Sequence, residues 1–251
     1  RLFNFFRKFQ ESVIYTGGSF LNDAEIPASA QLALIRRIAK IKQVECITVE
    51  SRPEYIDIRK LAELKLLLKG KQLKVAIGLE TQSDRIRTES VHKGFSSNDF
   101  AQALHSLKDQ GIYTIAHVFI KPLFLPEEAS IREAIASARY ALGEGANEVV
   151  FQAGTVHPHT RMYEEYQKGN YQPPDLNSII AILKNTYALG NIQIADFNDV
   201  PRPVAEPQSC GKCSTLIKKA LVKFRVDHDL AALTAISCDC PGYKRTKRDG
   251  Y

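Results

Sequence analysis

The sequence predicts an α/β fold, a TIM-type barrel of parallel strands covered by helices, with a small Cys-rich module near its C-terminal end. First, short β-branched apolar segments alternate five times with longer segments whose apolar residues recur at helical spacing. Second, the strand segments are apolar on both faces, as in a parallel sheet that is covered by helices. Third, a C-x-x-C motif near the end of the chain is followed by a C-x-C motif.

The expected elements follow one another as βα units. The expected strands are 12–16, 44–50, 73–80, 112–120 and 147–154. The expected helices are 28–42, 57–70, 96–111, 129–145 and 176–190. In the first helix, Leu32, Ile35, Ile38 and Ala39 form one apolar stripe. Several of these helices end in glycine, the usual C-terminal signal.

A doubly wound sheet and a TIM-type barrel both fit this alternation, and the strand ends favour the barrel. Each expected strand is followed by polar or special residues: Gly-Gly-Ser, Glu-Ser-Arg-Pro, Gly-Leu-Glu-Thr, Lys-Pro and Thr-Val-His-Pro-His-Thr. The C-terminal ends of all barrel strands meet at one mouth, where the active site lies. An open sheet needs such residues only beside its switch point.

Composition narrows the function classes. The chain has 251 residues, 44% of them hydrophobic, and a net charge of +6. No run of 18 apolar residues is present, and the opening segment RLFNFFRKFQ is too short and too basic for a secretory signal, so we expect a cytoplasmic protein without a membrane segment. Basic residues crowd near the end at Lys244, Arg245, Lys247 and Arg248, which indicates either a solvated tail or contact with a polyanion.

The strand ends carry the candidate binding residues. Gly17 and Gly18 lack the Gly-Lys-Ser/Thr of a phosphate loop, so they indicate either a tight turn or close backbone approach to a small polar ligand. Glu50 follows the next strand and Glu80 the one after it. A carboxylate at the mouth can accept two hydroxyl hydrogen bonds, whereas a surface pair between Glu50 and Arg52 would contribute little.

Together the motifs TGGSF, VESRPEYI, GLET with the following HKGF turn, and IAHVFI resemble the radical S-adenosylmethionine (SAM) barrel. The resemblance extends to the branch of the Elongator catalytic subunit and the radical-SAM archaeosine synthase. It implies that the glycine pair receives the amino group of SAM, that the strand-end glutamates lie near its ribose or methionyl part, and that Lys93 faces its carboxylate after a one-residue shift. The implied SAM-binding residues are Gly17, Gly18, Ser19, Glu50, Ser51, Glu80 and Lys93.

The resemblance also implies a 4Fe-4S cluster on a C-x-x-x-C-x-x-C loop, because such clusters require thiolate ligands. These 251 residues contain no such loop. We therefore expect the cluster cysteines upstream of residue 1, and residues 1–195 to form a radical SAM core that lacks its first βα unit. The implied activity is generation of a 5′-deoxyadenosyl radical, and the alternative is a non-catalytic RNA-binding homologue that has lost the cluster.

The segment from Gly154 to Leu183 narrows the resemblance to the archaeosine-synthase branch. The matching residues are Thr160, Glu164, Tyr171, Pro173, Pro174, Leu176 and Ser178. Asp175 and Asn177 stand where that branch would have aromatic residues. The resemblance implies a transfer RNA substrate carrying a lysine adduct on a 7-deazaguanine base, and a partner enzyme that attaches the lysine.

Other polar residues near the strand ends have two interpretations each. His117, Lys121 and Thr155 are candidates for substrate contact, with a structural role as the alternative. His157 and His159 form an H-x-H motif that would suit a zinc hydrolase or an exposed polar loop.

Residues 196–251 are expected to form a basic, metal-binding module. Its candidate ligands are Cys210, Cys213, Cys238 and Cys240, and two short helical patterns are expected between the two cysteine pairs, beginning near Ser214 and near Asp227. Four thiolates in this pattern are typical of a structural zinc site, while a disulfide pair and an auxiliary iron–sulfur cluster are the alternatives. Cys46 lies inside an apolar strand and is expected to be a core residue. The basic residues beside this module predict contact with transfer RNA phosphates.

Overall fold

The computed structural model describes residues 10–197, 199–234 and 236. Its strands are β1 (Glu11–Ile14), β2 (Cys46–Ser51), β3 (Gln72–Glu80), β4 (Tyr113–Ile120), β5 (Glu148–Ala153) and β6 (Asn191–Ile194). Its α-helices are α1 (Ala28–Ala39), α2 (Ile58–Leu68), α3 (Asp84–Ile86), α4 (Ser97–Asp109), α5 (Glu127–Gly143), α6 (Arg161–Gln167), α7 (Leu176–Thr186), α8 (Ser214–Asp227) and α9 (Ala231–Thr234). Short 3-10 turns cover Pro53–Tyr55 and Tyr187–Leu189, and a π-helical turn covers Arg87–Val91.

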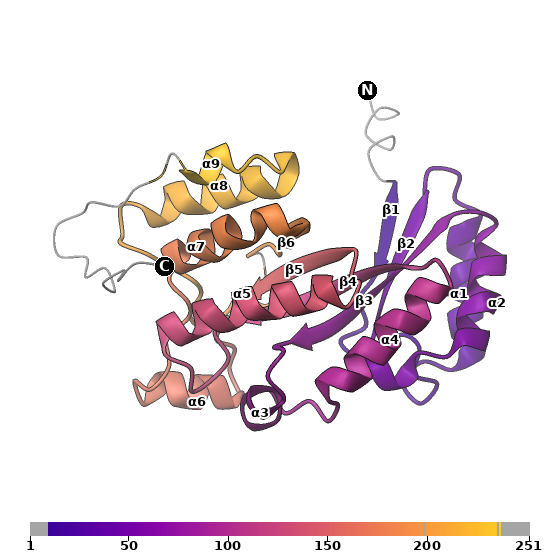
Figure 1. Cartoon of the computed structure of the whole chain (residues 1–251), viewed down its shortest axis with the longest axis horizontal. Coiled ribbons are helices and arrows are strands. Elements are labelled where there is room, and N and C mark those ends of the chain that lie inside the picture. The colour runs from indigo at the N-terminus through magenta and orange to yellow at the C-terminus, as the bar shows by residue number, and fades with distance from the viewer. Residues whose placement is uncertain (1–9, 198, 235, 237–251) are drawn as a thin grey trace. The chain divides into compact units, whose positions relative to one another are not determined.

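The strands are hydrogen-bonded in the order β1-β2-β3-β4-β5-β6 (Figure 1). A doubly wound sheet reverses its order at a switch point, whereas a TIM-type barrel keeps chain order. The pairs β1–β2 and β2–β3 are parallel, with Thr48 opposite Lys74 and Glu50 opposite Ala76. The prediction of an α/β fold of partial TIM type is therefore confirmed.

The described chain divides into two compact units. Of the described residues, the first unit comprises 10–79, 94–117 and 141–148, and the second comprises 80–93, 118–140, 149–197, 199–234 and 236. Each of the two contains ends of sheet strands that carry candidate site residues.

The core of the first unit forms between its helices and strands. Helices α1 and α2 pack side by side (Figure 1), and Ile35 and Leu61 are fully buried. Helix α2 is capped by Asp57, whose carboxylate accepts hydrogen bonds from the backbone amides of Arg59 (2.8 Å) and Lys60 (3.3 Å). Such a cap satisfies amides that the first helical turn leaves unpaired, so the helix start is fixed locally.

In the second unit, helices α7, α8 and α9 follow one another in contact (Figure 1). Helix α8 buries Ile217, Leu221 and Phe224 at intervals of four and three residues. This spacing places the three side chains on one face. The sequence predicted a short helix near Ser214, which α8 confirms; the second short helix begins at Ala231 rather than near Asp227.

Strand β6 is the element that the sequence analysis missed. The segment Asn191–Ile194 is only four residues long, too short for a period-two pattern to be distinct from a loop. Alternate residues of the strand are buried, with Ile192 at 1% and Ile194 at 2% exposure. Over the described residues, no helix combines the length and the apolar character needed to cross a bilayer.

Candidate functional site

The turn after β1 contains the glycine pair. Gly17 has φ +70°, a left-handed conformation that favours glycine. The carboxylate of Glu25 lies directly against Gly18: a Cβ built there would lie 1.8 Å from Glu25 Oε2. The same oxygen accepts a hydrogen bond from the Ser19 amide at 2.8 Å. The pair therefore forms a tight turn and allows a carboxylate to approach the backbone closely.

The structure brings this turn to the end of β2. The Arg52 amide donates to Ser19 Oγ at 3.1 Å, and the Phe20 amide donates to the Glu50 carbonyl at 2.8 Å. Ser19 is fully buried. The predicted residues Gly17, Gly18, Ser19, Glu50 and Ser51 therefore lie in one cluster at the ends of two adjacent parallel strands.

His117 in β4 lies beside Glu50. Its Nδ1 atom is 3.8 Å from Glu50 Oε1, and the His117 side chain is only 11% exposed. The sequence analysis named both residues separately. A buried imidazole next to a carboxylate can exchange a hydrogen bond with a polar ligand at the same place.

In the second unit, Glu80 and Lys93 form an ion pair. Lys93 Nζ lies 2.6 Å from Glu80 Oε1, and the two side chains are 26% and 14% exposed. Glu80 has φ +62°, which is uncommon for a residue with a side chain and is often retained at functional sites. Both residues were predicted to contact SAM, and the structure joins them by a bond that the sequence analysis did not predict.

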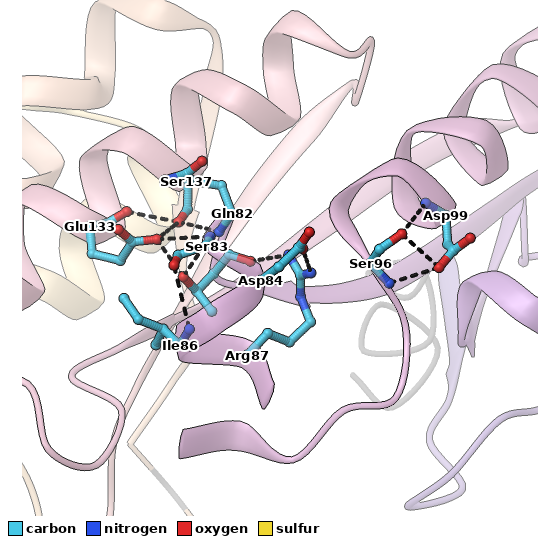
Figure 2. A network of polar contacts seen from close by, with 10 residues as sticks. Gln82, Ser83, Asp84, Ile86, Arg87, Ser96, Asp99, Glu133 and Ser137 are labelled. Atoms are coloured by element: carbon cyan, nitrogen blue, oxygen red, sulfur yellow. Dashed lines mark hydrogen bonds and ion pairs between the residues drawn. The ribbon is translucent and has the colours of Figure 1, made fainter. Parts of the chain in front are cut away.

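A polar network holds the segment between these two residues (Figure 2). Arg87 is fully buried and donates to the Thr81 carbonyl and to the Asp84 carboxylate. Glu133 of α5 accepts hydrogen bonds from the Thr81 hydroxyl and, at 3.2 Å, from the Ser83 amide. These bonds position the turn that directly follows Glu80.

The end of β4 carries a second such network. Lys121, at φ +63°, pairs with Glu127, and the Tyr171 hydroxyl donates to the Lys121 carbonyl at 3.0 Å. A Cβ built on Gly154 would lie 2.5 Å from the Tyr171 hydroxyl oxygen, so this glycine makes room for the tyrosine. Burial, reinforced by the negative charge of Glu127, raises the pKa of Tyr171 above its usual value.

After β5, Thr155 and His157 share a carboxylate. Asp199 Oδ2 accepts from the Thr155 hydroxyl at 2.8 Å and lies 3.1 Å from His157 Nε2. Within the part of the chain that the structure describes, no group of three or more His, Cys, Asp or Glu side chains could hold a metal ion. The zinc-hydrolase interpretation of the H-x-H motif therefore finds no support there.

Of the four cysteines predicted to bind metal, the structure places Cys210 and Cys213 just before α8. The Cys213 amide donates to Cys210 Sγ at 3.3 Å, which defines a tight turn. Cys238 and Cys240 lie outside the described residues.

Each unit, taken by itself, offers groups that suit a part of SAM. In the first unit, Glu50 and Ser51 at the strand end beside the glycine turn offer a carboxylate and a hydroxyl, which can accept hydrogen bonds from hydroxyl or amino groups. In the second unit, Lys93 already pairs with the carboxylate of Glu80, so its ammonium group suits a carboxylate ligand. The same chain does not fit a 4Fe-4S cluster: its five cysteines, at 46, 210, 213, 238 and 240, include no three with C-x-x-x-C-x-x-C spacing.

Comparison with known proteins gives relatives over most of the chain. It is 32% identical over 236 residues to archaeosine synthase subunit beta of Methanosarcina acetivorans, and 28% identical over 235 residues to the protein of that name from Thermococcus kodakarensis. It is also 32% identical over 231 residues to an uncharacterized protein of Methanocaldococcus jannaschii. Each alignment covers 90% of this chain. The alignments cover 66% of the Methanosarcina protein, 70% of the Thermococcus protein and 62% of the Methanocaldococcus protein. The chain thus spans just under two thirds of the Methanosarcina and Methanocaldococcus relatives.

Among solved structures, an archaeal Elp3 from Methanocaldococcus infernus with an N-terminal deletion has the same fold. The TM-score is 0.63 at 16% identity, over 85% of this chain and 54% of that chain. No family model matches the sequence. The strand-end motifs, the fold and these relatives agree. The chain belongs to the radical SAM superfamily, in the branch that contains Elp3 and the archaeosine synthase beta subunits.

Three site residues were not found from the sequence. Glu25 binds Ser19 and Arg87 binds Thr81, each from six residues away in the sequence. Asp199 binds Thr155 from 44 residues away. A common charged residue in a turn or loop carries no local pattern that distinguishes it, so only the fold shows these contacts.

Proposed function

We propose that this chain is the core of a radical SAM enzyme that modifies a transfer RNA base by chemistry of the archaeosine-synthase type. The observation that carries the proposal is the combination of 32% identity to an archaeosine synthase subunit beta with a glycine turn hydrogen-bonded to the Glu50–Arg52 strand end. The first supports the reaction class and the second supports a SAM site in this chain.

Each proposed SAM contact has a chemical role. The proposed residues are Gly17, Gly18, Ser19, Glu50, Ser51, Glu80 and Lys93. Backbone atoms of the glycine pair would bind the amino group, and the two glutamates would accept hydrogen bonds from ribose hydroxyls or the methionyl amine. Lys93 would exchange its Glu80 partner for the SAM carboxylate, a substitution of one oxyanion for another.

These 251 residues contain no C-x-x-x-C-x-x-C motif, so the proposal assigns no cluster ligand among them. The chemistry that a 4Fe-4S cluster supplies in this superfamily is one-electron cleavage of SAM, which yields a 5′-deoxyadenosyl radical. What this chain's own residues do is bind and orient SAM beside the substrate. A partner enzyme would first attach lysine to the 7-deazaguanine base of the transfer RNA.

We also propose that residues 196–251 form a zinc module that contacts the transfer RNA. Cys210, Cys213, Cys238 and Cys240 would supply the four thiolates. The tight turn between the first two, with an amide donating to Cys210 Sγ, is compatible with a thiolate pair on one metal. Metal analysis of the purified protein checks this part: about one zinc ion per chain is expected, and none after Cys210→Ser.

The test of SAM binding compares two glutamates at opposite ends of β2. Glu50→Gln removes a charge at the C-terminal end of β2, and Glu45→Gln removes one just before its N-terminal end, where Glu45 accepts from Gln10 at 3.1 Å. In the complete native protein, prepared anaerobically, we expect Glu50→Gln to weaken SAM binding at least tenfold, because a hydrogen bond to a charged group contributes about 1.5–3 kcal/mol. Glu45→Gln should bind like the unmodified protein, and equal affinities of the two variants would refute the assigned site.

The same preparation tests the reaction class. With SAM and a strong reductant, it should release 5′-deoxyadenosine, measured by mass spectrometry. The alternative of a non-catalytic RNA-binding homologue is motivated by the lack of a cluster motif in these residues. Transfer RNA binding without any 5′-deoxyadenosine would establish that alternative instead.

A further inference from the structure

Phe124, in the loop between β4 and α5, presents an aromatic ring to solvent from a strained backbone position. The residue is 56% exposed and has φ +68°. A left-handed conformation is unfavourable for a bulky residue, and a ring that is mostly exposed adds little hydrophobic stabilisation. The packing of the fold therefore does not explain the ring, and strained residues of this kind cluster where side chains hold ligands.

The loop that carries Phe124 is anchored on the protein core. The preceding residue, Leu123, is buried in a cluster with Val156 and Tyr171, and its carbonyl accepts a hydrogen bond from the Ser90 hydroxyl at 2.8 Å. The Tyr171 hydroxyl donates to the carbonyl of Lys121, at the start of the loop, at 3.0 Å. Because these contacts already order the loop, a ligand that binds the ring loses little affinity to loop ordering.

Arg161, the first residue of α6, lies against this ring. Its Cζ atom is 5.5 Å from the centroid of the Phe124 ring, within the range of a cation–π contact. Met162 and Tyr163, the next residues of the helix, pack against the same cluster as Leu123. The shared core therefore brings the guanidinium and the ring together.

The guanidinium of Arg161 keeps its hydrogen-bond donors for a ligand. Among the residues that the structure describes, no carboxylate forms an ion pair with Arg161. Glu164 and Glu165 follow on the same helix, but Glu165 binds Lys168 at 2.9 Å and Asn170 at 2.8 Å. A guanidinium that stacks on an aromatic ring can still donate two parallel hydrogen bonds to a phosphate.

An exposed ring beside such an arginine has the chemistry of a nucleotide contact. The aromatic face can stack with a base, and the guanidinium can bind the phosphate next to it. A protein docking surface needs a wider apolar patch, whereas Phe124 is the only exposed large apolar side chain between residues 67 and 186, all of which the structure describes. The net charge of +6 also suits a polyanion.

We propose that Phe124 and Arg161 form a binding site for one unpaired nucleotide of an RNA strand. Phe124 stacks with the base, and Arg161 binds the neighbouring phosphate. This inference deepens the proposed function, because it names two residues of this chain that contact the RNA.

The first test is NMR of the complete native protein with labelled phenylalanine rings, and it requires neither SAM nor a cluster. The probe is a single-stranded RNA hexamer of adenosine, and its counterparts are an abasic hexamer with the same number of phosphates and free AMP. The Phe124 signal is the one missing from Phe124→Tyr. We expect the adenosine hexamer to shift this signal upfield in a saturable way, because a stacked base shields the ring protons, and the abasic hexamer to leave it in place.

Variants then separate stacking from charge, with binding of the labelled adenosine hexamer measured by fluorescence anisotropy. Phe124→Leu should weaken binding at least fivefold, the lower limit for loss of a base–aromatic stack, while Phe124→Tyr keeps a ring and should bind like the unmodified protein. Arg161→Gln should reduce the slope of log affinity against log salt by about 0.7, the value for one phosphate contact on a single strand. The matched control is Arg85→Gln, which removes an exposed arginine paired with Glu89 (3.3 Å) and should leave that slope unchanged.

An upfield shift with the abasic hexamer, equal affinities of Phe124→Leu and Phe124→Tyr, or an unchanged salt slope in Arg161→Gln would overturn the proposal. Equal affinity for AMP and for the hexamer would overturn the assignment to RNA. If Phe124→Leu does not fold, the NMR response of the unmodified protein decides the same point. SAM binding and 5′-deoxyadenosine formation are measured without RNA, so failure of this site is distinguishable from failure of the proposed function.

Discussion

Replacing Arg87 by methionine should destabilise the protein markedly, although the new side chain has a similar length. Arg87 is fully buried and satisfies the Thr81 carbonyl and the Asp84 carboxylate (Figure 2). Methionine can donate to neither. An unsatisfied buried polar group costs about 1–3 kcal/mol, and loss of one partner of a fully buried ion pair costs about 3–5 kcal/mol.

The expected loss of stability in Arg87→Met lies inside this range of about 1–5 kcal/mol, because the two groups that Arg87 binds differ in exposure. The Asp84 side chain is 53% exposed, so water can solvate it after the substitution. The Thr81 carbonyl is buried with its residue, which is 1% exposed. We therefore expect a loss of about 2–3 kcal/mol, which for a chain of this size lowers the melting temperature by about 4–12 °C.

Arg85 provides the control. It lies two residues earlier in the same turn and also pairs with a carboxylate, Glu89 at 3.3 Å, but its side chain is 76% exposed. Arg85→Met should change stability by no more than about 0.5 kcal/mol. Urea and thermal unfolding of both variants measure the difference, and similar stabilities would refute the argument that the buried bonds of Arg87 hold this segment.

Three further predictions concern buried groups. Because burial raises the pKa of Tyr171, the unfolded chain releases the phenol proton near pH 10 while the folded chain keeps it. The free energy of unfolding should therefore fall as pH rises above about 10. Urea unfolding at a series of pH values should show a smaller fall for the Tyr171→Phe variant than for the unmodified protein. Gly154→Ala should destabilise the protein by about 1–3 kcal/mol, because the Cβ of the alanine would overlap the Tyr171 hydroxyl. Adding Tyr171→Phe to this variant should recover part of the lost stability, and additive effects of the two substitutions would contradict a contact between residues 154 and 171. Burial opposes ionisation of the Glu11 carboxyl group, but hydrogen bonds from Thr48 (2.6 Å) and Lys74 outweigh the effect of burial and keep the pKa of Glu11 below its usual range. Thr48→Val should therefore raise the pKa of Glu11 in a carbon NMR titration of the carboxyl group, and an unchanged titration would show that the Thr48 bond is not formed.

The elements that the sequence predicted correctly are those with long periodic patterns. The apolar stripe of α1 is a property of twelve consecutive residues, and it survives small errors at either end. Strand β6 has four residues and no such pattern, so only its pairing in the sheet defines it. Helix α9, also four residues long, was placed four residues too early for the same reason.

For the candidate site, the sequence indicated which residues lie at strand ends but not which of them meet. Gly17, Gly18, Glu50 and Glu80 were recognised because each directly follows or ends an apolar strand. Asp199 lies in a loop far along the chain, with no strand or motif beside it that marks a site.

By itself the sequence determined the fold class, the resemblance to a radical SAM barrel and the candidate SAM residues, because these depend on periodicity and on short motifs that are local in the chain. Only the tertiary structure decided the partners: Lys93 with Glu80, Ser19 with Arg52, and Asp199 with both Thr155 and His157. The physical reason is that hydrogen bonds and ion pairs depend on distances of about 3 Å between atoms, and those distances arise when the βα units pack and bring residues distant in the chain together.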